Sequence, residues 1–257
     1  MNAAGTRNLS AYTGLYGGEG DDKFGLFTGT PGTDIGIYGG AGNDKISGAV
    51  NFSTATIDAG AGDDMVYDVE EDYGMSVRNY NLGDGNDVFF GGSGGQTEVL
   101  GGAGNDKIFG PSDGYGGVNI ILMGEDGDDI IDHGDGNYGD YGYGGNGNDK
   151  IIGGMATDYG RYYGNAGDDK IWMINPEQRG LEVEPVSGWY GYGGPGNDHM
   201  FGSDVGEILV GDDGSLIDVA GELHLDYGAA PHADYYNEAD PGDDVIFGYG
   251  GSDDIFG

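Results

Sequence analysis

Aspartate residues recur along this chain in one fixed sequence context. The tripeptide Gly-(Asn/Asp)-Asp occurs ten times, and every copy has an apolar residue two places after its final Asp. The residue fractions of the chain would give roughly 0.6 copies by chance. The final residues of the copies are Asp22, Asp44, Asp64, Asp87, Asp106, Asp129, Asp149, Asp169, Asp198 and Asp244. Such regular repetition indicates a repeated binding loop, not an acid and base pair of a catalytic site.

Glycines surround each of these aspartates. A clear copy reads Gly39-Gly40-Ala41-Gly42-Asn43-Asp44-Lys45-Ile46, so the aspartate stands at the sixth position of the loop. Glycine lets the backbone take a positive φ and turn its carbonyls toward the inside of a tight loop. Calcium prefers six to eight hard oxygen ligands, which a short loop can supply by combining carbonyls with a carboxylate. The loops therefore have the composition of cation-binding loops.

The spacing of the aspartates predicts the architecture that positions them. From Asp22 to Asp198 successive sixth-position aspartates are separated by 22, 20, 23, 19, 23, 20, 20 and 29 residues. A coil of about twenty residues fits two short strands and two turns, of which only one turn keeps the full motif. The opposite turn is Gly-rich and irregular, as in 91–95, and we expect it to be a corner without metal. Two exceptions, Pro31-Gly32-Thr33-Asp34 and Asp253, could place a weaker row on that second side.

Alternation along the strands predicts which side chains point inward. The apolar residues that follow the loops are Ile46, Val66, Phe89, Ile108, Ile131, Ile151, Ile171 and Met200, and those that precede them are Leu15, Ile37, Ile57, Val99 and Leu122. The five lysines each follow a sixth-position aspartate, so we expect them to share one outward row, with charge compensation as the preferred role over anionic-glycan binding. Several tyrosines directly precede a loop and predict an outward ladder: Tyr16, Tyr38, Tyr143, Tyr163, Tyr192 and Tyr249.

The repeat resembles the nonapeptide G-G-x-G-x-D-x-U-x of the RTX (repeats-in-toxin), hemolysin-type calcium-binding family. An eleventh copy, residues 248–255, follows Asp244 at nine residues with Asp253 in the sixth position. The resemblance covers most of the chain and implies about 7–11 Ca²⁺ ions between stacked loops. The ligands it implies are the sixth-position carboxylates and glycine carbonyls of Gly18, Gly20, Asp22, Gly40, Gly42, Asp44, Gly60, Gly62, Asp64, Gly83, Gly85, Asp87, Gly102, Gly104, Asp106, Gly127, Asp129, Gly145, Gly147, Asp149, Gly167, Asp169, Gly194, Gly196, Asp198, Gly242, Asp244, Gly251 and Asp253.

We therefore expect an all-β, right-handed parallel β-roll of about 11 to 13 coils, with stacked calcium-binding loops on one side as in RTX adhesins. Residues 1–257 would form a single elongated domain. Residues 175–186 would project as a loop, and residues 220–238 would be an irregular insertion between repeats. Three residues depart from the motif and put the carbonyls at their loops in doubt: Glu125 and Asn165 replace the second glycine, and Pro241 stands at a third position.

Composition excludes several classes of protein. The 257 residues include 60 Gly, 46 acidic and 9 basic residues and no Cys, with a formal charge of -37. So much glycine argues against a helical or doubly wound fold, and the charge repels nucleic acid and anionic lipid. No apolar stretch is long enough to span a bilayer, and the absence of Cys excludes disulfides and thiolate metal sites. Cations are the partners that this charge favours.

The sequence favours a non-catalytic, secreted, calcium-binding structural or adhesive protein of the cell surface, surface layer or extracellular matrix. By resemblance, such proteins leave Gram-negative bacteria by type I secretion and fold outside the cell. Two intact repeats in tandem at 240–257 lead us to expect end-to-end self-association into filaments when calcium is bound. The alternatives are a folding and secretion module of a secreted enzyme whose catalytic domain is absent, and an ice- or glycan-binding adhesin module with a surface polysaccharide as partner.

Overall fold

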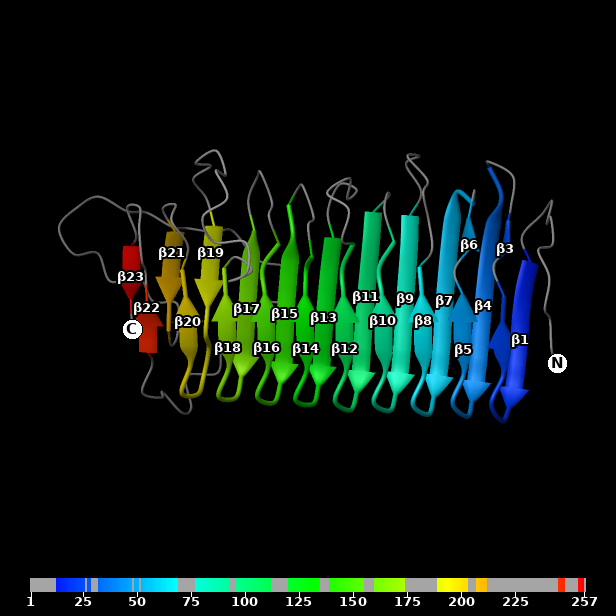
Figure 1. Ribbon diagram of the computed structural model, residues 1–257, viewed down its shortest axis with the longest axis horizontal. Helices are drawn as coiled ribbons and strands as arrows, with labels where there is room; N and C mark the ends of the chain where they lie inside the picture. The colour runs from blue at the N-terminus through cyan, green and yellow to red at the C-terminus, as the bar shows by residue number, and fades with distance from the viewer. Residues whose placement is uncertain are drawn as a thin grey trace.

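The chain is built from short parallel strands that succeed one another along a single axis (Figure 1). In the computed structural model the described residues are 13–25, 27–28, 32–47, 49–50, 52–68, 77–92, 96–111, 120–134, 139–154, 160–173, 189–202, 207–211, 245–247 and 254–256. All regular elements among these residues are strands. The described residues therefore include no helix long and apolar enough to cross a membrane.

Two large parallel sheets contain nearly all of the strands. The eleven-stranded sheet has the order β1 (Thr13–Glu19), β4 (Asp34–Ala41), β7 (Thr54–Ala61), β9 (Val77–Asp84), β11 (Gln96–Ala103), β13 (Ile120–Asp126), β15 (Tyr141–Asn146), β17 (Arg161–Ala166), β19 (Trp189–Tyr192), β21 (Glu207–Val210) and β23 (Asp254–Phe256). The ten-stranded sheet has the order β2 (Lys23–Phe24), β5 (Lys45–Ser47), β8 (Met65–Tyr67), β10 (Val88–Phe90), β12 (Lys107–Phe109), β14 (Ile130–Asp132), β16 (Lys150–Ile152), β18 (Lys170–Trp172), β20 (His199–Phe201) and β22 (Val245–Phe247). A small third sheet pairs β3 (Phe27–Thr28) with β6 (Ala49–Val50).

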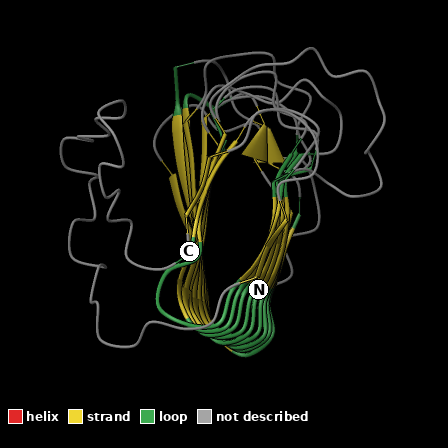
Figure 2. Cartoon of the chain, turned by 90° about the vertical axis from the view of Figure 1, so that its left-hand side faces the viewer, coloured by secondary structure: helices red, strands yellow, loops and turns green. Residues whose placement is uncertain are grey.

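Along the chain, the strands alternate between the two large sheets, so that each coil contributes one strand to each. This arrangement confirms the predicted all-β parallel β-roll. From β1 to β21 the strands of the first sheet have four to eight residues, whereas those of the second sheet have two or three. Figure 2 shows the sheets as two opposite walls that are joined along one edge by a band of short turns. These turns contain the repeated motif, and from β1 to β18 three residues join the two strands at each of them, as between Ala41 and Lys45. Variation in coil length is therefore accommodated at the opposite corner.

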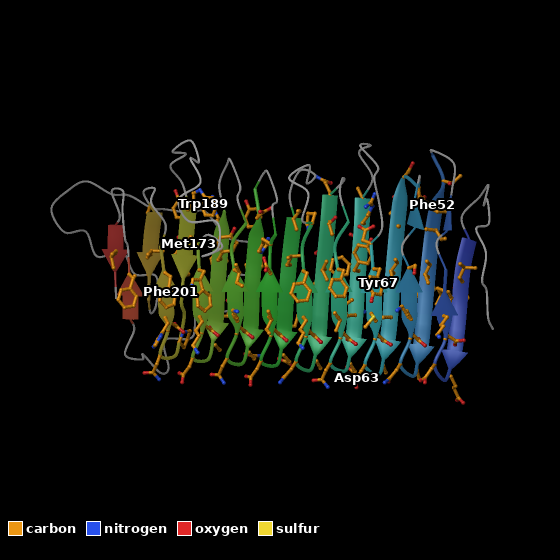
Figure 3. All side chains as sticks on the ribbon, in the orientation of Figure 1. Phe52, Asp63, Tyr67, Met173, Trp189 and Phe201 are labelled. Carbon is orange, nitrogen blue, oxygen red and sulfur yellow. The ribbon has the colours of Figure 1, made fainter. Side chains whose placement is uncertain are left out.

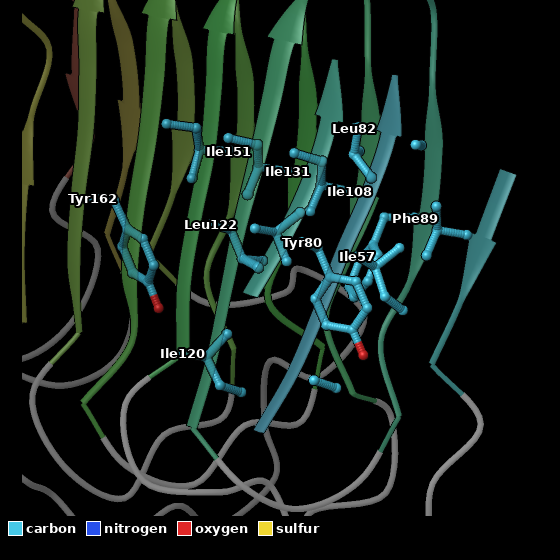
Figure 4. Close-up of a cluster of buried hydrophobic side chains, with 14 of the residues drawn as sticks. Ile57, Tyr80, Leu82, Phe89, Ile108, Ile120, Leu122, Ile131, Ile151 and Tyr162 are labelled. Atoms are coloured by element: carbon cyan, nitrogen blue, oxygen red, sulfur yellow. The ribbon is translucent and has the colours of Figure 1, made fainter. Parts of the chain in front are cut away.

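Alternation of side chains places the core between the two walls (Figure 4). In β7 buried and half-buried positions alternate, as they do in β11 and β15. All of the apolar residues predicted to point inward pack in this core, and apart from the partly buried Leu15 they are inaccessible to solvent. Each such buried aliphatic side chain stabilises the fold by roughly 1.5–3 kcal/mol. The hydrophobic core is thus a thin, continuous layer along the axis.

The register keeps equivalent positions of every repeat in line. Gly40 pairs with Gly60, which in turn pairs with Gly83. The same register puts the lysines in one outward row and stacks the tyrosines, with ring centroids of Tyr143 and Tyr163 4.9 Å apart. The predicted lysine row and tyrosine ladder are therefore confirmed; Tyr249 lies outside the described residues.

One coil has an unusually long connection. β20 pairs with β22 in register, His199 with Val245, although 46 residues separate Asp198 from Asp244. The strand pairing thus continues directly across this interval. The predicted loop at 175–186 and the predicted insertion at 220–238 lie outside the described residues, and the single domain over 1–257 stays a prediction.

Candidate metal centre

The motif corners have a backbone conformation that repeats from coil to coil. Positive φ values occur at the second and fourth loop positions, for example φ 114° at Gly40 and φ 127° at Gly42. All of the predicted glycine ligands from Gly18 to Gly196 have this conformation. The loops also nest closely, because a Cβ at Gly62 would lie 2.6 Å from the carbonyl carbon of Gly42. Glycine is therefore required both by conformation and by the approach of the neighbouring loop.

Glu125 and Asn165 adopt the same conformation although they are not glycines. They take φ 78° and 71° at the second loop position, which is the left-handed region that costs a side-chain-bearing residue stability. The main-chain path of these two loops is thus retained, and their carbonyls stay in register with Gly102, Gly145 and Gly194. The substitutions leave the loops intact.

The sixth-position aspartates form a ladder along the inside of the corner. The main-chain N–H of Asp44 donates to Oδ1 of Asp64 at 2.6 Å, and the N–H of Asp64 donates to Oδ1 of Asp87 at 2.6 Å. The same bond repeats in every pair of neighbouring loops from Asp22 to Asp198. Each aspartate from Asp44 to Asp198 thus uses one carboxylate oxygen to tie its loop to the preceding coil.

The fifth-position residues form a second ladder on the outside of the corner, where Figure 3 shows Asp63. Its hydrogen bonds run in the opposite direction, since the N–H of Asp63 donates to Oδ1 of Asn43 at 3.0 Å and the N–H of Asn86 donates to Asp63 at 2.9 Å. These side chains are exposed. Asn and Asp are interchangeable here because either one offers an acceptor oxygen to the next loop.

The second carboxylate oxygen of the inner ladder is buried and has no hydrogen-bond partner. This holds for Oδ2 of Asp44, Asp64, Asp87, Asp106, Asp129, Asp149 and Asp169, whose residues are all at most 2% exposed. A buried charged oxygen without a partner is costly, and native proteins normally pair it or bind a metal to it. A row of such oxygens therefore indicates a row of cation sites.

The unpartnered oxygens face a space beside the first loop position. A Cβ at Gly101 would lie 2.5 Å both from Oδ2 of Asp106 and from the carbonyl oxygen of Gly124 in the next coil. Two oxygens from adjacent coils thus converge beside the main chain of Gly101, which they can approach because glycine has no Cβ. The same arrangement recurs at Gly39, Gly144 and Gly164. We call this space the cradle.

The cradle identifies functional residues that the sequence analysis missed. The carbonyl ligands expected from the sequence are those of the second and fourth positions, whereas the structure brings the carbonyl of the first position to the same place as Oδ2 of the preceding coil's aspartate. The signal in the sequence is the repeated glycine at Gly17, Gly39, Gly101, Gly124, Gly144, Gly164 and Gly193. Two loops depart from it: the register aligns the buried Ala59 and Leu82 with this position.

Electrostatics of the corner favour a bound cation. Burial raises the pKa of Asp64 to about 7, that of Asp129 to about 6 and that of Asp169 to about 8, and neighbouring aspartates add to the shift. On the outside, hydrogen bonds from Asn86 lower the pKa of Asp63. A divalent cation in the cradle would stabilise the charged form of the inner carboxylates and offset their burial.

These donors fit calcium. Within the described part of the chain no three His, Asp or Glu side chains gather at one point, so each loop offers one carboxylate and main-chain carbonyls. An all-oxygen set of this kind suits a hard cation that tolerates irregular geometry, as calcium does. Asp22, Asp44 and their successors to Asp198, with the carbonyls of their loops, would hold the ions.

The remaining predicted ligands lie at the C-terminal end. Gly242, Asp244, Gly251 and Asp253 are outside the described residues. The strand after Asp244 joins the ten-stranded sheet next to β20, as the strands after the other ladder aspartates do. By contrast β23, which begins after Asp253, joins the eleven-stranded sheet beside β21. Asp34, the other candidate for the second side, is exposed at the start of β4.

The comparison with protein families agrees with this geometry. The family model described as RTX calcium-binding nonapeptide repeat (4 copies) matches residues 28–50, 81–95, 98–110, 121–139, 136–159, 192–205 and 238–257. The matches extend across the chain and include motif loops at both ends. The chain belongs to the RTX calcium-binding repeat family. No curated protein and no solved structure gives a significant match.

Proposed function

We propose that this protein is a secreted structural or adhesive protein of the cell surface, surface layer or extracellular matrix, and that it folds when it binds calcium. The observation that supports the proposal is the row of buried, unpartnered Oδ2 atoms in the ladder. These oxygens belong to residues that the fold brings together only in the completed roll. Cation binding and folding are therefore one process.

The net charge leads to the same expectation. At a formal charge of -37 the chain repels itself, and little but bound cations can offset that repulsion. About nine ions would contribute about +18 and leave about -19. A bacterium that exports the chain from a low-calcium cytosol would export it unfolded, since RTX repeat proteins are typically secreted by Gram-negative bacteria. The proposed location is extracellular or at the cell surface.

The test is far-ultraviolet circular dichroism during a calcium titration of the chelated protein. We expect a disordered spectrum without calcium and a cooperative change to β-structure in the millimolar range, with no such change at equal magnesium. Magnesium is a suitable control because it requires a smaller, near-octahedral site and gives up its water reluctantly. A β-spectrum that persists in excess chelator would contradict the proposal.

The main alternative keeps the calcium-dependent folding but makes the roll a folding and secretion module of a secreted enzyme. Under both versions the chain itself is not an enzyme, because its acidic pairs belong to the repeat and the Gly-x-Ser-x-Gly match at 91–95 lacks the strand-to-helix context of a nucleophile. Hydrolase activity of the calcium-loaded chain would contradict this assignment.

A further inference from the structure

The outer face of the ten-stranded sheet differs in charge from the molecule as a whole. The outward positions of its described strands carry five lysines and one histidine, but a single acid, Asp132. The chain has 46 acidic and 9 basic residues, so this one face holds more than half of the basic residues. We call it the lysine–aromatic face; its lysines are Lys23, Lys45, Lys107, Lys150 and Lys170, all of them exposed.

The lysines form a straight row along the axis of the roll. Lys23 is the register neighbour of Lys45, and Lys150 is the register neighbour of Lys170. Ile130 alone separates Lys107 from Lys150 in the row. Neighbouring strands lie about 4.7–4.9 Å apart, so the positive charges recur at one or a few strand spacings along a line.

Aromatic side chains form a parallel row two residues further along the same strands, as Tyr67 and Phe201 in Figure 3 show. Phe90 stacks between Tyr67 and Phe109, with ring centroids 5.1 and 5.3 Å apart. A second stack runs from Trp172 through Phe201 to Phe247, at 5.0 and 5.5 Å. Because the rings stack on one another, the row presents ring edges to solvent; Phe90 is 38% and Phe247 46% exposed.

The lysines of this face form no close ion pair within the described part of the chain. In the described part of the chain the recorded ion pair joins Arg78 to Asp68, and none joins a lysine of this face to an acid. The ladder aspartates are buried on the inside of the corner. Two ammonium groups lie over aromatic rings instead, Lys45 at 5.0 Å from the Tyr67 centroid and Lys150 at 5.3 Å from the Trp172 centroid. Contact with the ladder therefore does not explain the row.

We propose that the lysine–aromatic face binds an acidic polysaccharide that lies along the axis of the roll. A linear polyanion matches a linear row of ammonium groups, and the ring edges beside it offer an apolar surface to the C–H groups of sugars. Duplex nucleic acid has one charge per about 1.7 Å, which is much denser than the row of ammonium groups at one or a few strand spacings. The inference rests on the proposed function, since it names the partner class of the adhesive protein.

The test measures binding of the calcium-loaded protein to carboxymethyl-dextran and to dextran sulfate, with unmodified dextran as the neutral control. We expect binding to both charged polymers, no binding to dextran, and loss of affinity as salt is raised. The variant Lys150→Gln/Lys170→Gln should bind roughly tenfold more weakly, because each exposed pair contributes modestly. The charge-matched pair is Lys150→Gln and Arg161→Gln, since each removes one charge, the first from this face and the second from the outer face of the other sheet. Only Lys150→Gln should weaken binding.

Circular dichroism of each variant with and without calcium separates the two proposals. Failure of the parent protein to fold with calcium would contradict the proposed function, whereas a folded protein that ignores both charged polymers would overturn only the polysaccharide inference. Equal weakening by Arg161→Gln would also overturn it, because the effect would then follow net charge alone. Another outcome is that the protein self-associates without polymer and that Lys150→Gln/Lys170→Gln abolishes this association. This result would overturn the polysaccharide inference and indicate that the face binds the acidic corner of a second copy.

Discussion

At each motif corner the side chain of the first loop position decides how much space remains beside the ladder carboxylate. Gly144 leaves the cradle open, whereas Ala59 and Leu82 carry side chains at the equivalent positions. The φ of Gly144 is not in the positive range, so the main chain at this position can accept alanine. The cradles beside Asp64 and Asp87 should therefore bind calcium more weakly than those beside Asp106 and Asp149.

Gly144→Ala tests this expectation. The new Cβ would enter the space that faces Asp149 Oδ2 and the Gly164 carbonyl, and overpacking of this kind costs about 1–3 kcal/mol. We expect roughly tenfold weaker calcium binding at this site by isothermal titration calorimetry, or one ion fewer by native mass spectrometry. Ala59→Gly should act in the opposite sense and tighten one site. Unchanged calcium binding in both variants would remove the cradle from the site.

The ladder carboxylates should act mainly on neighbouring loops. Asp149→Asn keeps an acceptor for the N–H of Asp129 but removes the charge, so the calcium sites shared with Asp129 and Asp169 should weaken. Hydrogen exchange measured with calcium should show lost protection around these loops and little change around Asp22. The control is Asp128→Asn, because Asn already occupies the same exposed position in other repeats. Equal loss of protection at the Asp22 loop would contradict nearest-neighbour coupling.

At the scale of the strands, two coils place polar side chains inside the roll at equivalent positions. Asp68 follows β8 and forms a buried ion pair with Arg78 of β9, at 2.9 Å. Three coils further along the roll, the register puts His133 at the position of Asp68 and Asp140 at the position of Arg78. Both of these side chains are buried without hydrogen-bond partners. The long Arg78 side chain bridges the interior, whereas the shorter pair does not.

This difference predicts a pH-dependent stability that Asp140→Asn removes. Burial raises the pKa of Asp140 to about 7, while burial lowers the pKa of His133 to about 3 and keeps it neutral. Because the folded-state pKa is the higher one, the cost of ionising Asp140 is absent below about pH 4, grows as pH rises to about 7, and is constant above. The stability advantage of Asp140→Asn should grow by about 1.4 kcal/mol per pH unit in that interval.

The measurement is chemical unfolding of both proteins in saturating calcium from pH 4 to 8, which keeps the ladder equivalent in the two. A difference in unfolding free energy that is the same at every pH reports the buried amide of the variant. A difference that changes with pH reports the titration of Asp140. Parallel pH profiles of variant and parent would show that Asp140 is already ionised, and paired, within the fold.

At the scale of the whole molecule, the outermost described strands of each large sheet have a strand neighbour on one side. Among the described strands β1 and β23 each pair on one side, and so do β2 and β22. Near one end Phe247 and Ile255 are 46% and 47% exposed. Unpaired strand edges with exposed apolar residues favour association of chains, and contact between unlike ends builds filaments because it does not close.

Light scattering of the protein with and without calcium tests this expectation. We expect the calcium-loaded protein to grow in mass with concentration and the chelated protein to remain monomeric, because the edges exist only in the folded roll. Phe247→Lys or Ile255→Lys should reduce the association while leaving the calcium-induced circular dichroism unchanged. A calcium-loaded sample that is monomeric at high concentration would indicate that the ends are covered.

The sequence by itself determined the coil, the side of the roll that carries the carboxylates and the inward residues. The reason is that glycine conformation, alternation along a strand and a period of about twenty residues are local properties, which Gly42, Asp44 and Ile46 express within a few positions. The lysine row followed in the same way, because each lysine keeps one fixed distance from a ladder aspartate.

The tertiary structure alone decided what depends on contacts between coils. Only the stacking of loops shows that Oδ1 is taken by the preceding coil and that Oδ2 faces the first loop position, which gives Gly144 and Leu82 their meaning. Only strand pairing shows that β22 continues the row of β20 across 46 residues, and that Asp68 has a partner while Asp140 has none. Sequence spacing specifies the path of one coil, but the register and the interior distances arise when neighbouring coils pack.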